Sequence, residues 1–233
     1  TGETEYPDPD VMGYNPCAEQ SLAPYETCCL AEIYLPNIDS EEELNKVATY
    51  LYRINKHSLA IKCAVKETEE IVHKNMRMGI GVTGYLQATE KQRSWLKACY
   101  LYLREYDKKY SIDKGFPPSI KITTVKPSGT LSLEVITRLQ AEWSDNSVSV
   151  TVYYRKEELE AIKAWLSSHY HNVKSVSFLL HNEHGFDQAP LEEIDKKTYE
   201  SMKKRTTPIQ SLKDIKMEDI EISDCDSGAC PVR

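Results

Sequence analysis

The sequence predicts an α/β fold, in which strands and helices alternate along the chain. Three observations favour this fold. The run SVSVTVYY (147–154) alternates small polar and apolar residues, as a half-buried strand does. Residues 155–168 then have the amphipathic spacing of a helix, and VKSVSFLL (173–180) is again strand-like. Strands separated by helices in this order are typical of α/β proteins.

The first helix is predicted from its cap. The N-terminal ten residues are polar, carry prolines and are expected to be irregular. Ser40, followed three residues later by Glu43, is a capping box, and apolar residues then recur at helical spacing. We predict one long helix or two short ones here. Cys63 is expected in the continuation of this helical stretch as a small packing residue.

The middle of the chain continues the alternation. A helical pattern covers residues 67–72, and EKQRSWLKACYLYLREYDKKY (90–110) is a further helix with Cys99 as a core residue. Two prolines are expected to stop that helix, and IKITTV (120–125) is a β-rich run. Residues 133–142 are again predicted to be helical.

The composition narrows the classes of function. Asp and Glu outnumber Lys and Arg by 36 to 29, so the chain lacks the basic surface that nucleic-acid binding needs. No apolar run approaches the roughly 20 residues of a membrane span. The seven cysteines form no C-x-x-C pair and no zinc-site spacing, so we expect reduced, reactive or redox-cycling thiols and no metal site. A start at Thr1 is expected of a chain that has been cleaved or cropped.

The segment NPCAEQSLAPYETCC (15–29) gathers groups suited to thiol chemistry. Asn15, Cys17 and Glu19 follow one another at two-residue spacing. Side chains at i, i+2 and i+4 of an extended segment point the same way, so we expect an amide, a thiol and a carboxylate on one side. Cys28 follows eleven residues after Cys17, with Cys29 next to it.

A glycine pattern, Gly79-x-Gly81-x-x-Gly84, matches the dinucleotide-binding fingerprint. That fingerprint requires a strand before it and a helix after it. Here a helical pattern precedes the glycines. We therefore interpret them as a glycine-rich turn or strand with close backbone packing, and not as a nucleotide site.

A second glycine turn follows a predicted strand and opens a helical pattern. It comprises Pro127, Ser128, Gly129, Thr130 and Ser132. The free N–H groups and the positive dipole at a helix N-terminus suit a phosphate, and the hydroxyls can add hydrogen bonds. Lys126 adds a positive charge nearby. An ordinary N-cap turn has the same pattern, and the local sequence does not separate the two.

Near the end of the chain, Cys225 and Cys230 are separated by Asp, Ser, Gly and Ala. A flexible segment of this kind lets two sulfur atoms reach disulfide distance. An exposed pair is readily reduced and reoxidised. We interpret the two residues as a thiol–disulfide carrier on a flexible tail, residues 211–233.

In this order, the motifs resemble those of the ribonucleotide reductases, in particular the monomeric adenosylcobalamin-dependent (class II) ribonucleoside-triphosphate reductases. The matching segments are NPCAEQSLAPYETCCL, MRMGIGVTG, GFPPSIKITTVKPSGTLS, AEWSDNSVSVTVYYRKEEL, VSFLLHNEHGFDQAP and CDSGACP. The resemblance implies that residues 1–210 form part of the ten-stranded α/β barrel of that family. Residues 211–233 would be its flexible redox tail.

The resemblance also implies roles for the residues of the first loop. Cys17 would become a thiyl radical and abstract the 3′ hydrogen of the ribose. Glu19 would be the general base at the 3′ hydroxyl, with Asn15 as its hydrogen-bonding companion. Cys28 would be one of two cysteines that deliver reducing equivalents as the 2′ hydroxyl leaves. We assign no role to Cys29.

Further implications concern ligands and partners. The turn from Pro127 to Ser132 would hold the substrate phosphates. Cys225 and Cys230 would re-reduce the active-site disulfide and be reduced by thioredoxin or a similar dithiol. The implied cofactor is adenosylcobalamin, whose binding residues the sequence does not identify. The implied substrate is a ribonucleoside triphosphate, and the expected compartment is the cytoplasm.

The chain also departs from the family. The part that precedes the first loop in family members, with half of the barrel and the redox partner of Cys28, is missing, and an apparent deletion falls near residues 133–134. Three explanations stay open: segments that the sequence omits, a second chain that completes the barrel, or a non-catalytic remnant that serves as a structural subunit. A stand-alone thiol–disulfide oxidoreductase ranks last, because Cys225 and Cys230 are not a C-x-x-C at a helix start.

Overall fold

The computed structural model of the chain describes residues 8–128, 132–180 and 194–206. It contains two compact units, Thr1–Glu183 and His184–Arg233. In the second unit the described element is helix α7 (Lys196–Arg205). The predicted tail with Cys225 and Cys230 lies outside the described residues. The predicted boundary at residue 210 stays a prediction.

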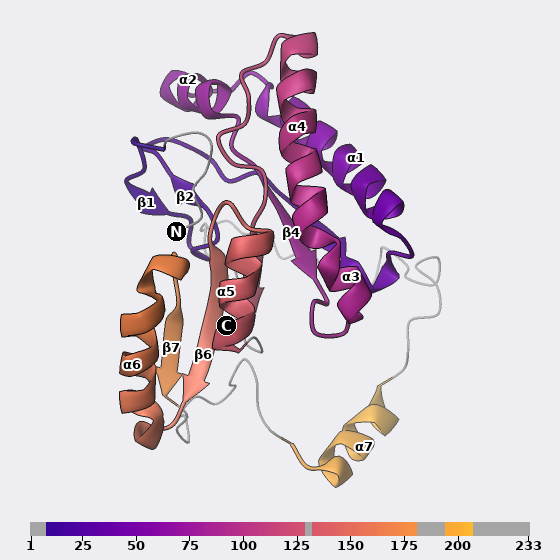
Figure 1. Cartoon of the computed structure of the whole chain (residues 1–233), viewed down its shortest axis with the longest axis vertical. Coiled ribbons are helices and arrows are strands. Elements are labelled where there is room, and N and C mark those ends of the chain that lie inside the picture. Colours follow the sequence, from indigo (N-terminus) through magenta and orange to yellow (C-terminus); the bar gives the residue numbers. More distant parts are fainter. Residues whose placement is uncertain (1–7, 129–131, 181–193, 207–233) are drawn as a thin grey trace. The chain divides into compact units, whose positions relative to one another are not determined.

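The first unit is built on a parallel sheet (Figure 1). Its strands are β3 (Leu30–Tyr34), β4 (Gly79–Thr83), β5 (Val125–Ser128), β6 (Val148–Tyr154) and β7 (Ser177–Leu180). Strand β3 pairs with β4, β5 with β6, and β6 with β7, all in parallel. Backbone hydrogen bonds from Ile80 N to Ile122 O (2.8 Å) and from Thr124 N to Ile80 O (3.1 Å) join β4 to the residues before β5. The strands therefore lie side by side in chain order, as in one half of a barrel.

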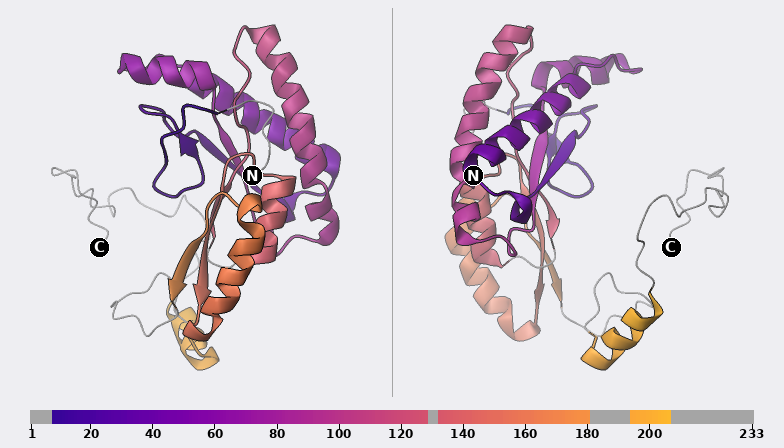
Figure 2. Two further views of the ribbon diagram at one scale, coloured as in Figure 1. Left: turned by 60° about the vertical axis from the view of Figure 1, so that its left-hand side comes forward. Right: turned by 90° about the vertical axis from the view of Figure 1, so that its right-hand side faces the viewer.

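Helices cover one side of this sheet. The helices of the first unit are α1 (Glu41–Leu59), α2 (Lys66–Asn75), α3 (Glu90–Ser94), α4 (Leu96–Lys114), α5 (Leu133–Glu142) and α6 (Leu159–His169), with short 3₁₀ turns at Leu35–Asn37, Lys156–Glu158 and Tyr170–Asn172. Figure 2 shows α1, α4, α5 and α6 on one side of the strands. The hairpin of β1 (Gly13–Tyr14) and β2 (Ser21–Leu22) lies on the other side. None of the described helices is long and apolar enough to cross a membrane.

The hydrophobic core lies between the sheet and these helices. Strand residues Ile33, Ile80 and Val82 are buried there with helix residues such as Leu44 and Leu103. Successive side chains of a strand point to opposite faces. The glycines at positions 79 and 81 therefore belong to the opposite, hairpin side of β4. The strand interpretation of the glycine pattern is confirmed.

The predicted cap of the first helix is confirmed. Ser40 Oγ accepts a hydrogen bond from Glu43 N at 3.2 Å, and the Glu43 carboxylate accepts one from Asp39 N at 2.8 Å. The prediction for Cys63 is wrong, because α1 ends at Leu59. Cys63 lies in the following turn, where its backbone N–H donates to the carboxylate of Glu69 in α2.

The second long helix differs from its prediction in two ways. Trp95 separates α3 from α4, and α4 ends at Lys114 because Gly115 adopts a left-handed conformation with φ +71°. Glycine, and not the prolines that follow, ends the helix. Cys99 is fully buried on α4, as predicted.

The strand predicted from residue 120 begins later. The carboxylate of Asp145 accepts hydrogen bonds from Ile122 N (3.0 Å) and Thr123 N (2.8 Å). These two N–H groups are therefore not available to a neighbouring strand. The ladder with β6 starts only at Val125. A side chain more than twenty positions away decides where the strand begins.

We expect Gly79→Ala to destabilise the sheet. A Cβ atom at this position would lie 2.7 Å from Leu30 Cδ2, 2.8 Å from Thr124 Cγ2 and 2.9 Å from Gln20 Nε2. The free energy of unfolding in urea should fall by about 1–3 kcal/mol through overpacking. Gly13→Ala is the matched control, because nothing lies within 4 Å of a Cβ atom there. Equal losses in both variants would contradict this packing.

Lys174 is a half-buried cation before β7. Its Nζ donates hydrogen bonds to the carbonyls of Asp145 (2.5 Å) and Asn146 (3.1 Å). Burial lowers the pKa of Lys174 to about 8, and the positive charge of Lys121 acts in the same direction. The folded chain therefore releases this proton more readily than the unfolded chain does.

This difference predicts a pH dependence of stability. Between a pKa of about 8 in the folded chain and 10.5 for an ordinary lysine, the unfolded chain binds more protons. The free energy of unfolding should rise with pH across this window by ~3 kcal/mol relative to Lys174→Met, which has no group to titrate. Urea unfolding of both proteins at about pH 7.5 and about pH 10 measures the effect. If the difference in the free energy of unfolding between the two proteins stayed constant with pH, this pH dependence would be ruled out.

Candidate active site

The NPC segment forms the loop of the β1–β2 hairpin. Asn15 N donates a hydrogen bond to Gln20 O at 3.0 Å, and Gln20 N donates to Asn15 Oδ1, also at 3.0 Å. Inside the loop, Ala18 N donates to Asn15 O at 2.9 Å, and Ala18 has a φ of +58°. Asn15 therefore closes the loop with both its backbone and its side chain.

The expected extended geometry of this segment is wrong. The backbone turns between residues 15 and 20, and the left-handed Ala18 interrupts the alternation of side chains. Asn15 and Glu19 are buried, whereas Cys17 is exposed. The loop exposes the thiol and keeps the amide and the carboxylate inside.

The sheet holds this loop through three successive backbone carbonyls, those of residues 17–19. The donors are the hydroxyls of Ser149, Ser175 and Thr124 and the backbone N–H of Ser147. The Thr124 hydroxyl lies 2.7 Å from the Glu19 carbonyl, and the Ser175 hydroxyl lies 3.3 Å from the Ala18 carbonyl. These donors lie near the amino ends of β5, β6 and β7, so three strand segments fix the backbone around Cys17. Sequence reasoning missed them, although alternating hydroxyls in the predicted strand at 147–154 were a signal.

Next to Cys17 the loop carries buried polar atoms without a hydrogen-bond partner among the described residues. They are Glu19 Oε2 and both amide atoms of Gln20. Glu19 is 2% exposed and Gln20 is 0% exposed. Leaving such atoms unpaired is costly, so they indicate a place for water or a ligand group. A carboxylate oxygen in this position is able to accept a proton from that group.

The two adjacent cysteines have different surroundings. Cys28 is exposed. Cys29 is half-buried, its Sγ lies 3.9 Å from the Asn55 carbonyl, and burial raises its pKa to about 11, with the charge of Cys28 adding to the rise. Thiolate is the reactive form, so Cys28 is the better placed of the two for thiol–disulfide exchange.

The predicted phosphate turn is described only in part. Gly129 and Thr130 lie outside the described residues. Pro127 and Ser128 end β5. Ser132 caps α5, because its hydroxyl accepts a hydrogen bond from the backbone N–H three residues later at 3.4 Å. Ser132 thus has the N-cap role that the sequence left open, and phosphate binding stays a prediction.

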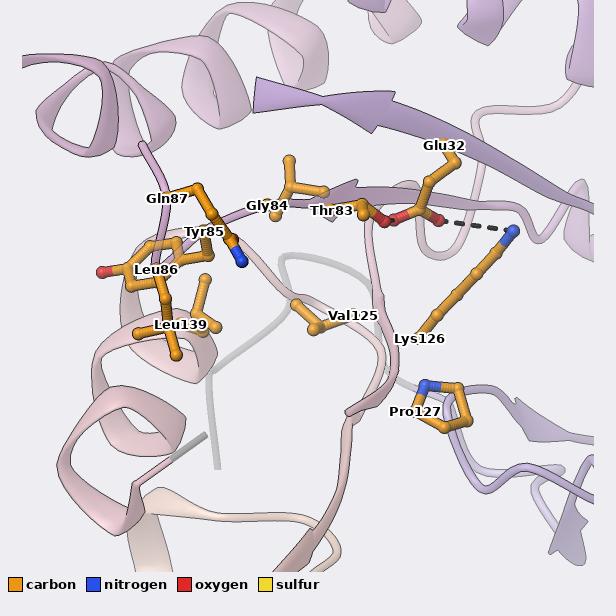
Figure 3. Close-up of a pocket in the computed structure, with 11 residues that line it drawn as sticks. Glu32, Thr83, Gly84, Tyr85, Leu86, Gln87, Val125, Lys126, Pro127 and Leu139 are labelled. Carbon is orange, nitrogen blue, oxygen red and sulfur yellow. Dashed lines mark hydrogen bonds and ion pairs between the residues drawn. The ribbon is translucent and has the colours of Figure 1, made fainter. Parts of the chain in front are cut away.

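A cavity of about 230 Å³ opens beside this turn, at the carboxyl ends of β3, β4 and β5 (Figure 3). Residues 83–87, Lys126 and Pro127 are among those that line it. Lys126 Nζ lies 3.3 Å from Glu32 Oε2, and the Thr83 hydroxyl donates to Glu32 Oε1 at 2.6 Å. Ligands of α/β sheets bind at this end of the strands. In the described parts of the chain, no three His, Cys, Asp or Glu side chains are placed to hold a metal ion.

Ser149→Ala should loosen the loop around Cys17. The variant loses the hydrogen bond to the Cys17 carbonyl, which corresponds to about 0.5–1.5 kcal/mol. Amide hydrogen exchange of residues 15–20 should become about 2- to 10-fold faster. Ser168→Ala is the control, because it removes a comparable hydroxyl–carbonyl bond on α6. Unchanged exchange in Ser149→Ala would show that the sheet does not hold the loop.

Comparisons with known proteins agree with this fold. Residues 8–95 match the family model of the ribonucleotide reductase barrel domain. The chain is 26% identical over 314 residues to a probable adenosylcobalamin-dependent ribonucleoside-triphosphate reductase of Dictyostelium discoideum, across 99% of this chain and 41% of that protein. It is 34% identical over 137 residues to the adenosylcobalamin-dependent ribonucleoside-triphosphate reductase of Euglena gracilis, across 57% of this chain and 19% of that one.

A solved structure gives the same result for the fold. A crystal structure of a B12-dependent (class II) ribonucleotide reductase superposes with a TM-score of 0.70 and 22% identity, over 89% of this chain and 45% of that one. The prediction of an α/β fold that forms part of the reductase barrel is confirmed. The resemblance to the adenosylcobalamin-dependent ribonucleotide reductases is also confirmed. The chain spans less than half the length of these relatives. The 314 aligned positions exceed the 233 residues of the chain by 81, as expected if it lacks an internal segment.

Proposed function

We propose that this chain, a relative of the adenosylcobalamin-dependent ribonucleotide reductases, carries the reaction centre that reduces ribonucleoside triphosphates to 2′-deoxyribonucleotides. One observation carries the proposal. The exposed Cys17 thiol lies on a loop held by the sheet, two residues from the buried Glu19 carboxylate with an unpartnered oxygen. A thiol for hydrogen abstraction and a base for the neighbouring hydroxyl are what this reduction requires.

The residues present fit a radical mechanism. When bound, adenosylcobalamin would supply the unpaired electron. The Cys17 thiol is exposed, so it is accessible for the formation of a radical on its sulfur. The Cys17 radical takes the 3′ hydrogen of the ribose and later returns it. Glu19 Oε2 accepts the proton of the 3′ hydroxyl, and Asn15 orients that hydroxyl. We assign no residue of this chain to holding the cobalamin.

The reductive half of the cycle uses Cys28. The 2′ hydroxyl leaves as water, and two thiols become a disulfide, so one electron and one proton come from each. Exposed Cys28 is one of them, and its partner belongs to the part of the barrel that a second chain or a further segment supplies. Cys225 and Cys230 re-reduce this disulfide, with thioredoxin or a similar dithiol as their reductant. Residues 1–210 form the partial barrel, and residues 211–233 form the redox tail.

The turn from Pro127 to Ser132 holds the substrate phosphates in this proposal. Support comes from its position at the start of α5, where free N–H groups suit an anion. The five described cysteines are free thiols, which agrees with a reducing compartment such as the cytoplasm.

A non-catalytic structural subunit is the second candidate. The observation that favours it is the internal shortening, because the alignment with the Dictyostelium discoideum relative has 81 more positions than this chain has residues. The denatured intact mass of the native protein separates the cases. A mass near 26.7 kDa would mean that either another chain completes the barrel or the chain has a non-catalytic role. A far larger mass would mean that further segments belong to the same polypeptide.

Cys17→Ala tests the reaction centre. We expect the variant of the native protein to lose hydrogen exchange between the 5′ carbon of adenosylcobalamin and solvent, because no other described thiol occupies this loop. Cys63→Ala is the control and should keep the exchange, since Cys63 lies in the turn after α1. Hydrogen exchange that persists in Cys17→Ala would contradict the assignment of Cys17 as the thiyl radical.

Cys225→Ser tests the tail separately. Turnover driven by thioredoxin should stop after about one cycle, because a single remaining thiol cannot re-reduce a disulfide by exchange. Turnover with a small dithiol should persist, since such a reductant reaches exposed Cys28 directly. Thioredoxin-driven turnover at the unchanged rate would remove the tail from the mechanism.

A further inference from the structure

The Glu32–Lys126 ion pair crosses the hairpin side of the sheet. Glu32 lies on β3 and Lys126 on β5, and β4 runs between them. The pair is possible because position 81 of β4 is glycine. A Cβ atom there would collide with the Glu32 carboxylate. At this position, the close packing that we predicted for the glycine pattern leaves room for a charge pair above β4.

Figure 3 shows that the Glu32–Lys126 pair lies at the wall of the cavity, with Pro127 next to Lys126. The Lys126 side chain is 38% exposed and that of Glu32 is 24% exposed. A partly exposed ion pair of this kind is weak, because solvent screens both charges. Lys126 is therefore able to exchange its partner at little cost.

Glu32 keeps a partner when Lys126 leaves. The Thr83 hydroxyl donates to Glu32 Oε1 at 2.6 Å, whereas Glu32 Oε2 has no hydrogen-bond partner among the described residues beyond the ionic contact with Lys126. The carboxylate thus has one oxygen held by the strand and one that faces the cation. This arrangement favours an exchangeable pair over a permanent structural one.

We propose that Lys126 is the cation that binds a phosphate group in this cavity, and that Glu32 holds the ammonium group until the phosphate replaces the carboxylate. The identification of that phosphate with the substrate's rests on the proposed function. A phosphate carries more negative charge than a carboxylate and offers three acceptor oxygens, so it competes well for an ammonium group. The Glu32 carboxylate also repels anions when Lys126 is absent, which gives the two residues opposite effects on affinity.

Titration calorimetry of the full chain with inorganic tripolyphosphate tests the exchange. Lys126→Met should raise the Kd about 10-fold, because a charge-assisted contact is lost. Glu32→Gln should lower the Kd about 3-fold, because the competitor is neutralised. Lys126→Arg should stay near the wild-type Kd, and Lys163→Met is the matched control, since it removes an exposed ion pair on α6. Urea unfolding of each variant shows that it is folded.

The outcomes separate this inference from the proposed function. Opposite shifts in Lys126→Met and Glu32→Gln support the exchange. Weaker binding in both variants, or no binding of tripolyphosphate, overturns it. A ribonucleoside triphosphate that binds equally well to Lys126→Met also overturns it, while the proposed function still stands. Lys126-dependent binding of tripolyphosphate, together with hydrogen exchange that persists in Cys17→Ala, leaves the inference intact and removes the proposed function.

Discussion

The candidate site depends on the hydrogen bonds that the sheet donates to the backbone carbonyls of residues 17–19. A two-stranded hairpin is at best marginally stable by itself. Here its loop is tied to segments near β5, β6 and β7 by Thr124, Ser149 and Ser175. Because the donors come from a sheet that also carries the hydrophobic core, these hydrogen bonds fix the loop backbone to the core. They hold the backbone of both Cys17 and Glu19.

Strand β4 makes this arrangement possible with two glycines. Gly79 lets the Gln20 side chain of the hairpin lie against the strand, and Gly81 leaves room for the Glu32 carboxylate. A side chain at either position would displace one of these groups. The same strand thus supports the thiol loop and the charged wall of the cavity, on the side of the sheet opposite α1, α4, α5 and α6 (Figure 2). The two glycines allow close packing of side chains against the strand.

Helix α5 lies between β5 and β6 in the chain. It begins at Leu133, after the N-cap residue Ser132, and is followed by β6, which pairs in parallel with β5. The missing positions of the longer relatives are therefore not needed to close this part of the sheet. Strands β3 and β7 each pair with a single strand among the described residues. Open edges of this kind favour a partner that continues the sheet, in agreement with a barrel completed by other residues.

The sequence by itself determined the elements whose signals are local. Ser40 and Glu43 marked the start of α1, and apolar spacing marked α5 and α6, because capping and amphipathic periodicity act within a few residues. Tertiary structure alone decided the conformation of the loop around Cys17 and the start of β5. The donors to that loop lie more than 100 positions further along the chain, and Asp145 withholds two N–H groups from the strand. No local pattern encodes contacts at that separation.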